Sequence, residues 1–160
     1  MIGWYSPVGG GLENKEGGRV MAIKKNGKES IQGLFEKGLA IRREVLGAEY
    51  VEKAIREADD FTRAMQEFTT MFCWGTVWTR PGLTRKSRSM INLAMLTALN
   101  RPHEIEIHVR AALNNGLTKD EIREVFLQTA VYCGVPAAID SFRIAKKIFA
   151  DPSPGRKGMK

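Results

Sequence analysis

An acidic and a basic side chain four residues apart are the part of this sequence best suited to proton transfer. Glu104 and His108 lie in the segment 102–115, whose apolar positions recur with a helical period. Residues four apart on a helix share one face. A carboxylate beside an imidazole orients the ring and raises its pKa, which suits acid–base work near neutral pH. The same spacing also fits a structural pair that joins two helices or two subunits.

Small residues next to this pair leave room for a ligand. Ala111 and Ala112 share its side of the expected helix, next to a core stripe. We therefore expect Glu104 and His108 at the margin of the buried face. Arg110 points nearly the opposite way from His108, so it is expected to face water or to reach a neighbouring subunit.

A second group of candidates could form an anion-binding pocket: Trp74, Trp78, Arg80, Arg88 and Ser89. The tryptophans and the Arg80-Pro-Gly turn would wall a partly apolar pocket. Arg88 and Ser89 fall in the first turns of the next helix, where backbone N–H groups and arginine favour anions. The alternative interpretation is structural: the tryptophans are core, Arg88 pairs with an acid of its own chain, and Arg80 decorates a turn.

The sequence does not indicate a metal site or a phosphate-binding loop. Its two histidines, His103 and His108, are five residues apart, which is poor spacing for one metal ion on a helix. The two cysteines, Cys73 and Cys133, form no CxxC pair, and we expect both to be small buried core residues. A thiol pair brought together by folding is the alternative.

Helical periodicity dominates residues 29–150 and predicts one all-α domain, a compact bundle of six to seven helices. Residues 1–28 and 151–160 are expected to be flexible tails, with Met21 as a possible alternative start. Gly47 and Gly116 are expected to end helices, and Thr118 with Glu121 forms a capping box. The segment 85–99 is apolar nearly all round and is expected to be buried on most sides. The expected helices are, approximately, 30–46, 48–58, 60–77, 85–99, 102–115, 119–133 and 136–150.

Charge and hydropathy limit the partners of the chain. The formal net charge is +7 over 160 residues, but the basic residues do not gather in one stripe. We expect a solvated surface that attracts a small anionic substrate, and not a nucleic-acid interface. No apolar run is long enough to cross a membrane, and no secretory signal is apparent. These features predict a cytoplasmic protein without a membrane partner.

Several stretches together resemble the carboxymuconolactone decarboxylase family, over about residues 38–149. The order and spacing of the motifs agree with the family. The residues that carry the resemblance are Gly38-Leu-Ala-Ile-Arg-Arg-Glu-Val-Leu-Gly47, Trp74-Gly-Thr-Val-Trp-Thr-Arg-Pro-Gly-Leu83 with Arg88-Ser89, Glu104-x-x-x-His108-x-Arg110-x-Ala112, Asn115-Gly116-Leu-Thr, Glu121-Ile-x-Glu124-Val, and Tyr132-Cys-Gly-Val-Pro-Ala-Ala138.

The resemblance implies a fold shared with alkylhydroperoxidase D and a ring of subunits, a hexamer or a trimer. It implies conversion of 4-carboxymuconolactone, or a similar anionic lactone, into 3-oxoadipate enol-lactone in the breakdown of aromatic compounds (the beta-ketoadipate pathway). No cofactor or metal is implied. His108 would then donate the proton and Glu104 would orient it. The expected substrate-binding residues are Arg80, Arg88, Ser89, Arg110, Trp74 and Trp78.

Two positions depart from the family's pattern. Peroxidase relatives carry a CxxC on the segment that aligns with 101–108, where this chain has Arg101 and Glu104. Tyr50 stands where the decarboxylases tend to have histidine, which leaves the exact substrate open. Two other functions remain as alternatives: a thiol-dependent peroxidase that uses Cys73 and Cys133, and a non-catalytic oligomeric module that binds an acidic metabolite.

Overall fold

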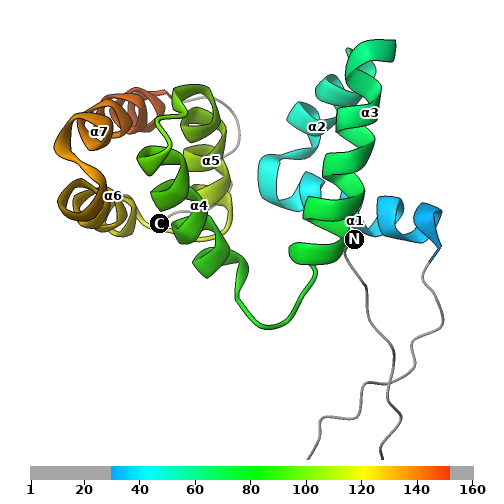
Figure 1. Ribbon diagram of the computed structural model, residues 1–160, viewed down its shortest axis with the longest axis horizontal. Helices are drawn as coiled ribbons and strands as arrows, with labels where there is room; N and C mark the ends of the chain where they lie inside the picture. The colour runs from blue at the N-terminus through cyan, green and yellow to red at the C-terminus, as the bar shows by residue number, and fades with distance from the viewer. Residues whose placement is uncertain (1–29, 152–160) are drawn as a thin grey trace, which may run out of the picture.

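Seven α-helices and one π-helix make up the part of the chain that the structure describes, residues 30–151 of a computed structural model (Figure 1). No strand occurs within this range, so the all-α prediction is confirmed. The expected tail 1–28 and residues 152–160 lie outside the described residues. The elements are α1 (Ile31–Leu46), α2 (Ala48–Arg56), α3 (Asp60–Phe68), η1 (Thr69–Val77), α4 (Arg85–Ala98), α5 (Pro102–Asn114), α6 (Lys119–Cys133) and α7 (Val135–Ala150).

The helices gather in two groups (Figure 1). Helices α4 to α7 pack around the larger core cluster, in which Leu93, Val109, Ile122 and Phe126 are fully buried. Helices α1 to α3 and η1 form the second group, reached from α4 by the loop 78–84. A smaller cluster of Val45, Trp74, Trp78 and Ala111 joins the groups, because Ala111 belongs to α5.

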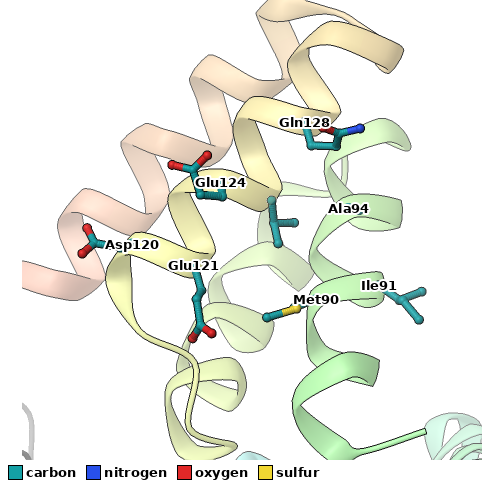
Figure 2. A pocket seen from close by; sticks show the side chains of 8 residues that line it. Met90, Ile91, Ala94, Asp120, Glu121, Glu124 and Gln128 are labelled. Carbon is teal, nitrogen blue, oxygen red and sulfur yellow. The ribbon is translucent and has the colours of Figure 1, made fainter.

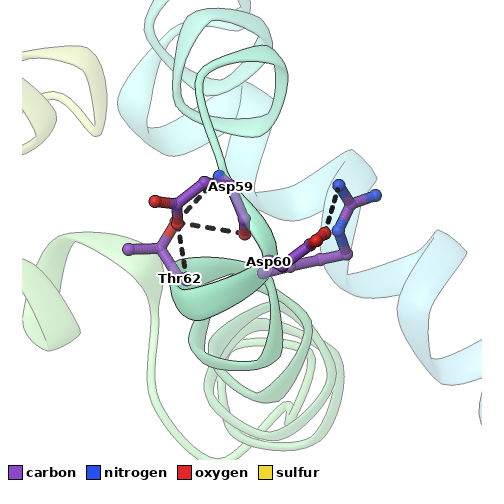
Figure 3. A network of polar contacts seen from close by, with 4 residues as sticks. Asp59, Asp60 and Thr62 are labelled. Carbon is purple, nitrogen blue, oxygen red and sulfur yellow. Dashed lines mark hydrogen bonds and ion pairs between the residues drawn. The ribbon is translucent and has the colours of Figure 1, made fainter.

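The helix ends follow local capping chemistry. Thr118 and Glu121 form the predicted capping box, in which each side chain bonds the other residue's backbone N–H. Asp59 and Thr62 form an equivalent box at the start of α3, and Figure 3 shows the Asp59 carboxylate accepting from the Thr62 N–H at 2.9 Å. Gly47 and Gly116 end helices with φ of 95° and 85°, a region that favours glycine.

Two glycines let the backbones of α1 and η1 touch. A Cβ atom added to Gly38 would collide with the carbonyl oxygen of Thr70, and one added to Gly75 would collide with the carbonyl oxygen of Leu34. Only residues without a side chain permit this approach. The crossing holds Thr70 of η1 against α1.

The second half of the expected helix 60–77 is a π-helix. The Trp78 N–H bonds the carbonyl oxygen of Cys73 at 3.0 Å, a five-residue step in place of the usual four. The hydroxyls of Thr76 and Thr79 also bond carbonyls one turn back. Thr70, Trp74 and Trp78 are all buried, so this wider helix turns one side of η1 towards α1 and α5.

Two expectations about burial were wrong for this chain on its own. Both cysteines are exposed, because Cys73 flanks the inward-facing Trp74 and Cys133 is the last residue of α6. Helix α4 is not buried on most sides: Ile91, Met95 and Leu99, spaced four apart, form an exposed stripe along it. Within residues 30–151, no helix is long and apolar enough to cross a membrane.

Candidate active site

Helix α5 places Glu104 and His108 where the core meets the surface. Pro102 stands at the first position of the helix, where its missing N–H costs no hydrogen bond. Ile105, Val109 and Ala112 anchor the buried face of α5. Glu104 is exposed and His108 is half-buried, one turn apart. Their position at the margin of the buried face agrees with the helical pattern.

The His108 ring is only partly accessible. Its Nδ1 atom is buried without a hydrogen-bond partner. Burial lowers the pKa of His108 below its usual 6.5, and the nearby Glu104 charge only partly opposes this shift. Glu104 therefore raises the pKa of the ring as expected, but the net shift is downward, because loss of hydration outweighs the effect of one exposed carboxylate. The lowered pKa favours the neutral form of the ring.

Glu104 acts on its neighbours through charge. No hydrogen bond joins it to His108 among the contacts of residues 30–151, and the His108 Nδ1 atom has no partner there. The charge of this carboxylate also affects the pKa of Tyr50, a residue of α2. Burial raises the pKa of Tyr50 above its usual 10.0, and the Glu104 charge raises it further, while Arg42 opposes both.

Arg42 of α1 is a buried charged residue that the sequence pattern did not indicate. It is 5% exposed. Its Nη1 donates to the Thr70 hydroxyl at 2.9 Å and its Nη2 to the Gln66 amide oxygen at 2.8 Å, while Nε is buried without a partner. No carboxylate of the described residues pairs with it. The helical register gives a weak signal in the sequence, since Arg42 lies four residues after Gly38 and three before Val45, but its charged neighbours mask that signal.

Trp74 and Trp78 are core side chains, as the structural interpretation predicts. Their rings stack with centroids 4.7 Å apart and planes 29° apart. They pack with Val45 of α1 and with Ala111, which lies one turn after His108 on α5. The tryptophans therefore form a buried floor between α1 and α5, next to the turn that carries His108.

Arg88 has no carboxylate partner within residues 30–151, contrary to the structural alternative for it. Its Nη2 donates to the Arg80 carbonyl oxygen at 3.1 Å, and its Nε is buried and unpartnered. The Arg80 side chain is exposed. The structure thus brings Arg88 to the Arg80 turn, with an uncompensated guanidinium that suits an anion.

Ser89 and Arg110 are held by contacts within the fold. The Ser89 hydroxyl is 1% exposed and accepts a hydrogen bond from the Asn115 amide at 2.9 Å. Arg110 pairs with Asp151 at 3.0 Å and with Glu106 at 3.8 Å. Both residues join separate elements of the fold, so neither is assigned to the candidate active site. Among the described residues, no three His, Cys, Asp or Glu side chains group as metal ligands.

A groove of about 570 Å³ lies elsewhere, between α4 and α6 (Figure 2). Its floor is apolar, with Met90, Ile91 and Ala94 of α4. Asp120, Glu121 and Glu124 stand along its α6 side. Three carboxylates repel an anionic ligand, so we do not assign the expected substrate to this groove.

The sequence profile of the carboxymuconolactone decarboxylase family matches residues 63–147. The chain is 48% identical over 118 residues to the nitrosuccinic acid decarboxylase of Metarhizium robertsii, covering 74% of this chain and 82% of that protein. It is 42% identical over 117 residues to the 4-carboxymuconolactone decarboxylase of Acinetobacter baylyi, covering 73% of this chain and 87% of that protein.

The all-α fold and these similarities define a carboxy-lyase. The chain belongs to the carboxymuconolactone decarboxylase family. Both relatives are named as decarboxylases, although their names give different substrates.

Proposed function

We propose that this decarboxylase acts on a small acid whose departing carboxylate neighbours an electron-accepting group. The first candidate substrate is 4-carboxymuconolactone or a similar anionic lactone, which would give 3-oxoadipate enol-lactone. The second is nitrosuccinic acid, because the relative with that activity is 48% identical. The observation that supports both is the half-buried His108 one turn from Glu104 on α5, which packs against α1 and α4, the helices that carry Arg42 and Arg88.

The two candidates share one chemical step. The bond between carbon and the carboxylate breaks, CO₂ leaves, and the electron pair moves to an oxygen of the acceptor group, a conjugated lactone carbonyl or a nitro group. One proton is then added to carbon and restores the neutral acceptor: in nitrosuccinate at the nitro-bearing carbon that lost CO₂, and in the lactone at the carbon α to the carbonyl, the far end of the conjugated system. Because the acceptor belongs to the substrate, the proposed reaction uses no cofactor. The protein must hold anionic groups, stabilise the new negative charge and deliver a proton.

His108 is the proposed proton donor. The lowered pKa favours the neutral form of the free ring, so the ring must first gain a proton. A bound carboxylate close to the ring raises its pKa, because an opposite charge favours the protonated form. Glu104 contributes in the same direction through its charge. Substrate binding thereby favours the protonated ring, and this ring donates its proton to carbon after CO₂ has left.

Arg88 and Arg80 are the proposed carboxylate-binding residues. Arg88 suits this role because no carboxylate of the described residues pairs with its guanidinium group. Its hydrogen bond to the Arg80 carbonyl also holds the Arg80 turn next to it. Trp74 and Trp78 serve as the rigid floor, which keeps the α5 turn of His108 fixed against α1.

We further propose that the chain works as a homo-oligomer, a hexamer or a trimer. Phe61, Met65, Phe68 and Phe72 are exposed at spacings of four, three and four along α3 and η1. An apolar helix stripe of this kind marks an interface in soluble proteins. Exposed free thiols at Cys73 and Cys133 suit a reducing compartment, so the cytoplasm is the proposed location.

The deciding experiment is ultraviolet-monitored turnover of freshly prepared 4-carboxymuconolactone and of nitrosuccinate, with His108→Ala as the variant and His103→Ala as its control. We expect one substrate to turn over and His108→Ala to abolish the reaction. Turnover that survives in a folded His108→Ala protein contradicts the assigned role. Turnover of neither substrate above the spontaneous rate removes both named reactions.

The two alternative functions are separated by simple controls. A peroxidase that depends on Cys73 and Cys133 would lose its activity when both are changed to serine, whereas the proposed decarboxylase keeps its turnover. A non-catalytic module would be stabilised against heat by an acidic ligand without any turnover.

A further inference from the structure

A second cavity, of about 240 Å³, lies between the first half of α6 and the last half of α7. None of the residues assigned to the candidate active site lines it. We propose that this cavity binds one small aromatic carboxylate, with the ring of the ligand inside and its carboxylate at a rim of lysine side chains. This inference does not depend on the proposed function.

The lining of the cavity is largely aromatic. Phe126 is fully buried, and Phe142 and Phe149 are partly buried. The rings of Phe126 and Phe142 meet edge to face, with centroids 5.6 Å apart and planes at 66°. Ile122 and Ala145 add to the apolar lining. Because aromatic rings favour edge-to-face and offset contacts with one another, a flat ring suits this cavity better than a saturated one.

The rim of the cavity carries an excess of positive charge. Arg123 donates to Asp120 at 2.8 Å and to Glu124 at 3.3 Å, so its charge is compensated. Lys119 and Lys146 also line the cavity, and no carboxylate of the described residues pairs with either of them. Two ammonium groups are therefore available to a ligand, and both favour an anion.

One of these lysines is held beside a ring of the cavity. The Nζ atom of Lys119 lies 5.1 Å from the centroid of the Phe149 ring, within the range of a cation–π contact. The ring orients the ammonium group without neutralising its charge. A ligand whose ring enters between α6 and α7 can therefore leave its carboxylate at Lys119.

Size and charge narrow the class of ligand. A volume of 240 Å³ equals that of about eight water molecules, which is less than a drug-sized ligand needs. One ring with a short acidic group fits this space, whereas a peptide or a nucleotide does not. Asp120 also lies on the rim and would repel a second anionic group. A monocarboxylate is therefore preferred over a dianion.

The cavity shares residues with the core that supports α5. Ile122, Phe126 and Ala145 line it, and all three belong to the larger core cluster together with Val109 of α5. A ligand that binds only the folded protein stabilises it by mass action. We therefore expect the carboxylate to stabilise α4 to α7 as a group.

The test uses benzoate as the probe and follows isoleucine methyl signals of the full-length protein by NMR. We expect benzoate to shift the signal of Ile122, which lines the cavity, and to leave that of Ile91, in the acidic groove, unchanged. The Kd should be about 1 mM or below, as is reasonable for a ligand of this size.

Three further probes separate the contributions of ring and charge. Inorganic phosphate has the charge without the ring, and benzyl alcohol has the ring without the charge. We expect each to bind at least about tenfold more weakly than benzoate. Cyclohexanecarboxylate has the charge and a saturated ring, so it should bind more weakly than benzoate but more tightly than phosphate.

The informative variant is Lys119→Gln combined with Lys146→Gln. Both residues are exposed, so the thermal unfolding midpoint without ligand should stay unchanged. We expect benzoate to bind this variant at least about tenfold more weakly. Lys147→Gln is the matched control, since Lys147 is an exposed lysine of α7 that does not line the cavity. Arg88→Gln should keep the Ile122 shift, because Arg88 belongs to the candidate active site.

Each other outcome overturns the proposal. Unchanged benzoate binding in the folded double variant removes the role of the lysines. Benzyl alcohol as tight as benzoate would leave an apolar cavity only, and phosphate as tight would leave a charged surface only. Equal binding of cyclohexanecarboxylate would remove the aromatic preference. A shift of Ile91 in place of Ile122, or loss of the Ile122 shift in Arg88→Gln, would place benzoate elsewhere on the protein.

Discussion

Gly38 and Gly75 meet where α1 crosses η1, and neither position has space for a side chain. We expect Gly38→Ala to lower the free energy of unfolding by about 2 kcal/mol or more, because the added methyl group must push two backbones apart. Denaturant unfolding followed by circular dichroism measures the change. Gly82→Ala is the control, since nothing lies within 4 Å of a Cβ atom there. Equal stability of the two variants would contradict the close crossing.

Burial of His108 predicts a pH-dependent stability. Folding lowers the pKa of His108 below 6.5, so the unfolded chain binds more protons at acidic pH. The contribution of His108 is fully present above pH 6.5 and is lost as pH falls through the folded-state pKa. His108→Gln should therefore flatten the fall in unfolding free energy below pH 6.5, while the exposed His103→Gln should not. Parallel pH profiles for wild type and His108→Gln would argue against a buried ring.

Ser89 serves the fold in this structure, and its replacement should show that. Ser89→Ala removes the buried hydrogen bond to Asn115 and leaves the amide short of one acceptor. We expect a loss of about 1–2 kcal/mol in unfolding free energy, with KM for the active substrate unchanged. Thermal unfolding and steady-state kinetics on the same preparation give both numbers. A raised KM at unchanged stability would return Ser89 to the binding site.

The exposed stripe on α3 predicts an assembly that charge disrupts. Phe61 is 91% exposed, so Phe61→Glu removes nothing from the core of the single chain. In an interface, the same carboxylate would be desolvated without a partner. We expect light scattering after gel filtration to show a smaller species for Phe61→Glu, with the helical content retained. Lys53→Glu, on an exposed position of α2, is the control. An unchanged molar mass would place the interface elsewhere.

The helix boundaries were predictable because they depend on neighbours in sequence. Caps such as Thr118 with Glu121, and the glycines at 47 and 116, act within a few residues of the helix ends that they define. The π-helical half of 60–77 was not predictable in this way. Its wider turns accompany the close crossing of η1 by α1, which involves residues more than thirty positions apart in the sequence.

The same reason explains which site residues were found. Glu104 and His108 are one turn apart on one helix, so spacing alone pairs them. Arg42 stands beside Arg43 and Glu44 and reads as surface charge; its burial depends on Thr70, 28 residues away. The charge of Glu104 acts on Tyr50, but α3, η1 and α4 separate these two residues along the chain. No local sequence pattern therefore pairs them.

Helix α5 contributes to both hydrophobic clusters, with Val109 and Ala112 in the larger one and Ala111 in the smaller one. Glu104 and His108 both lie on this helix, so their spacing does not depend on how the two groups of helices pack together. Tyr50 and Arg42 belong to the other group. The position of Arg42 relative to the acid–base pair is therefore set by how α1 packs against α5, through contacts such as that of Val45 with Ala111.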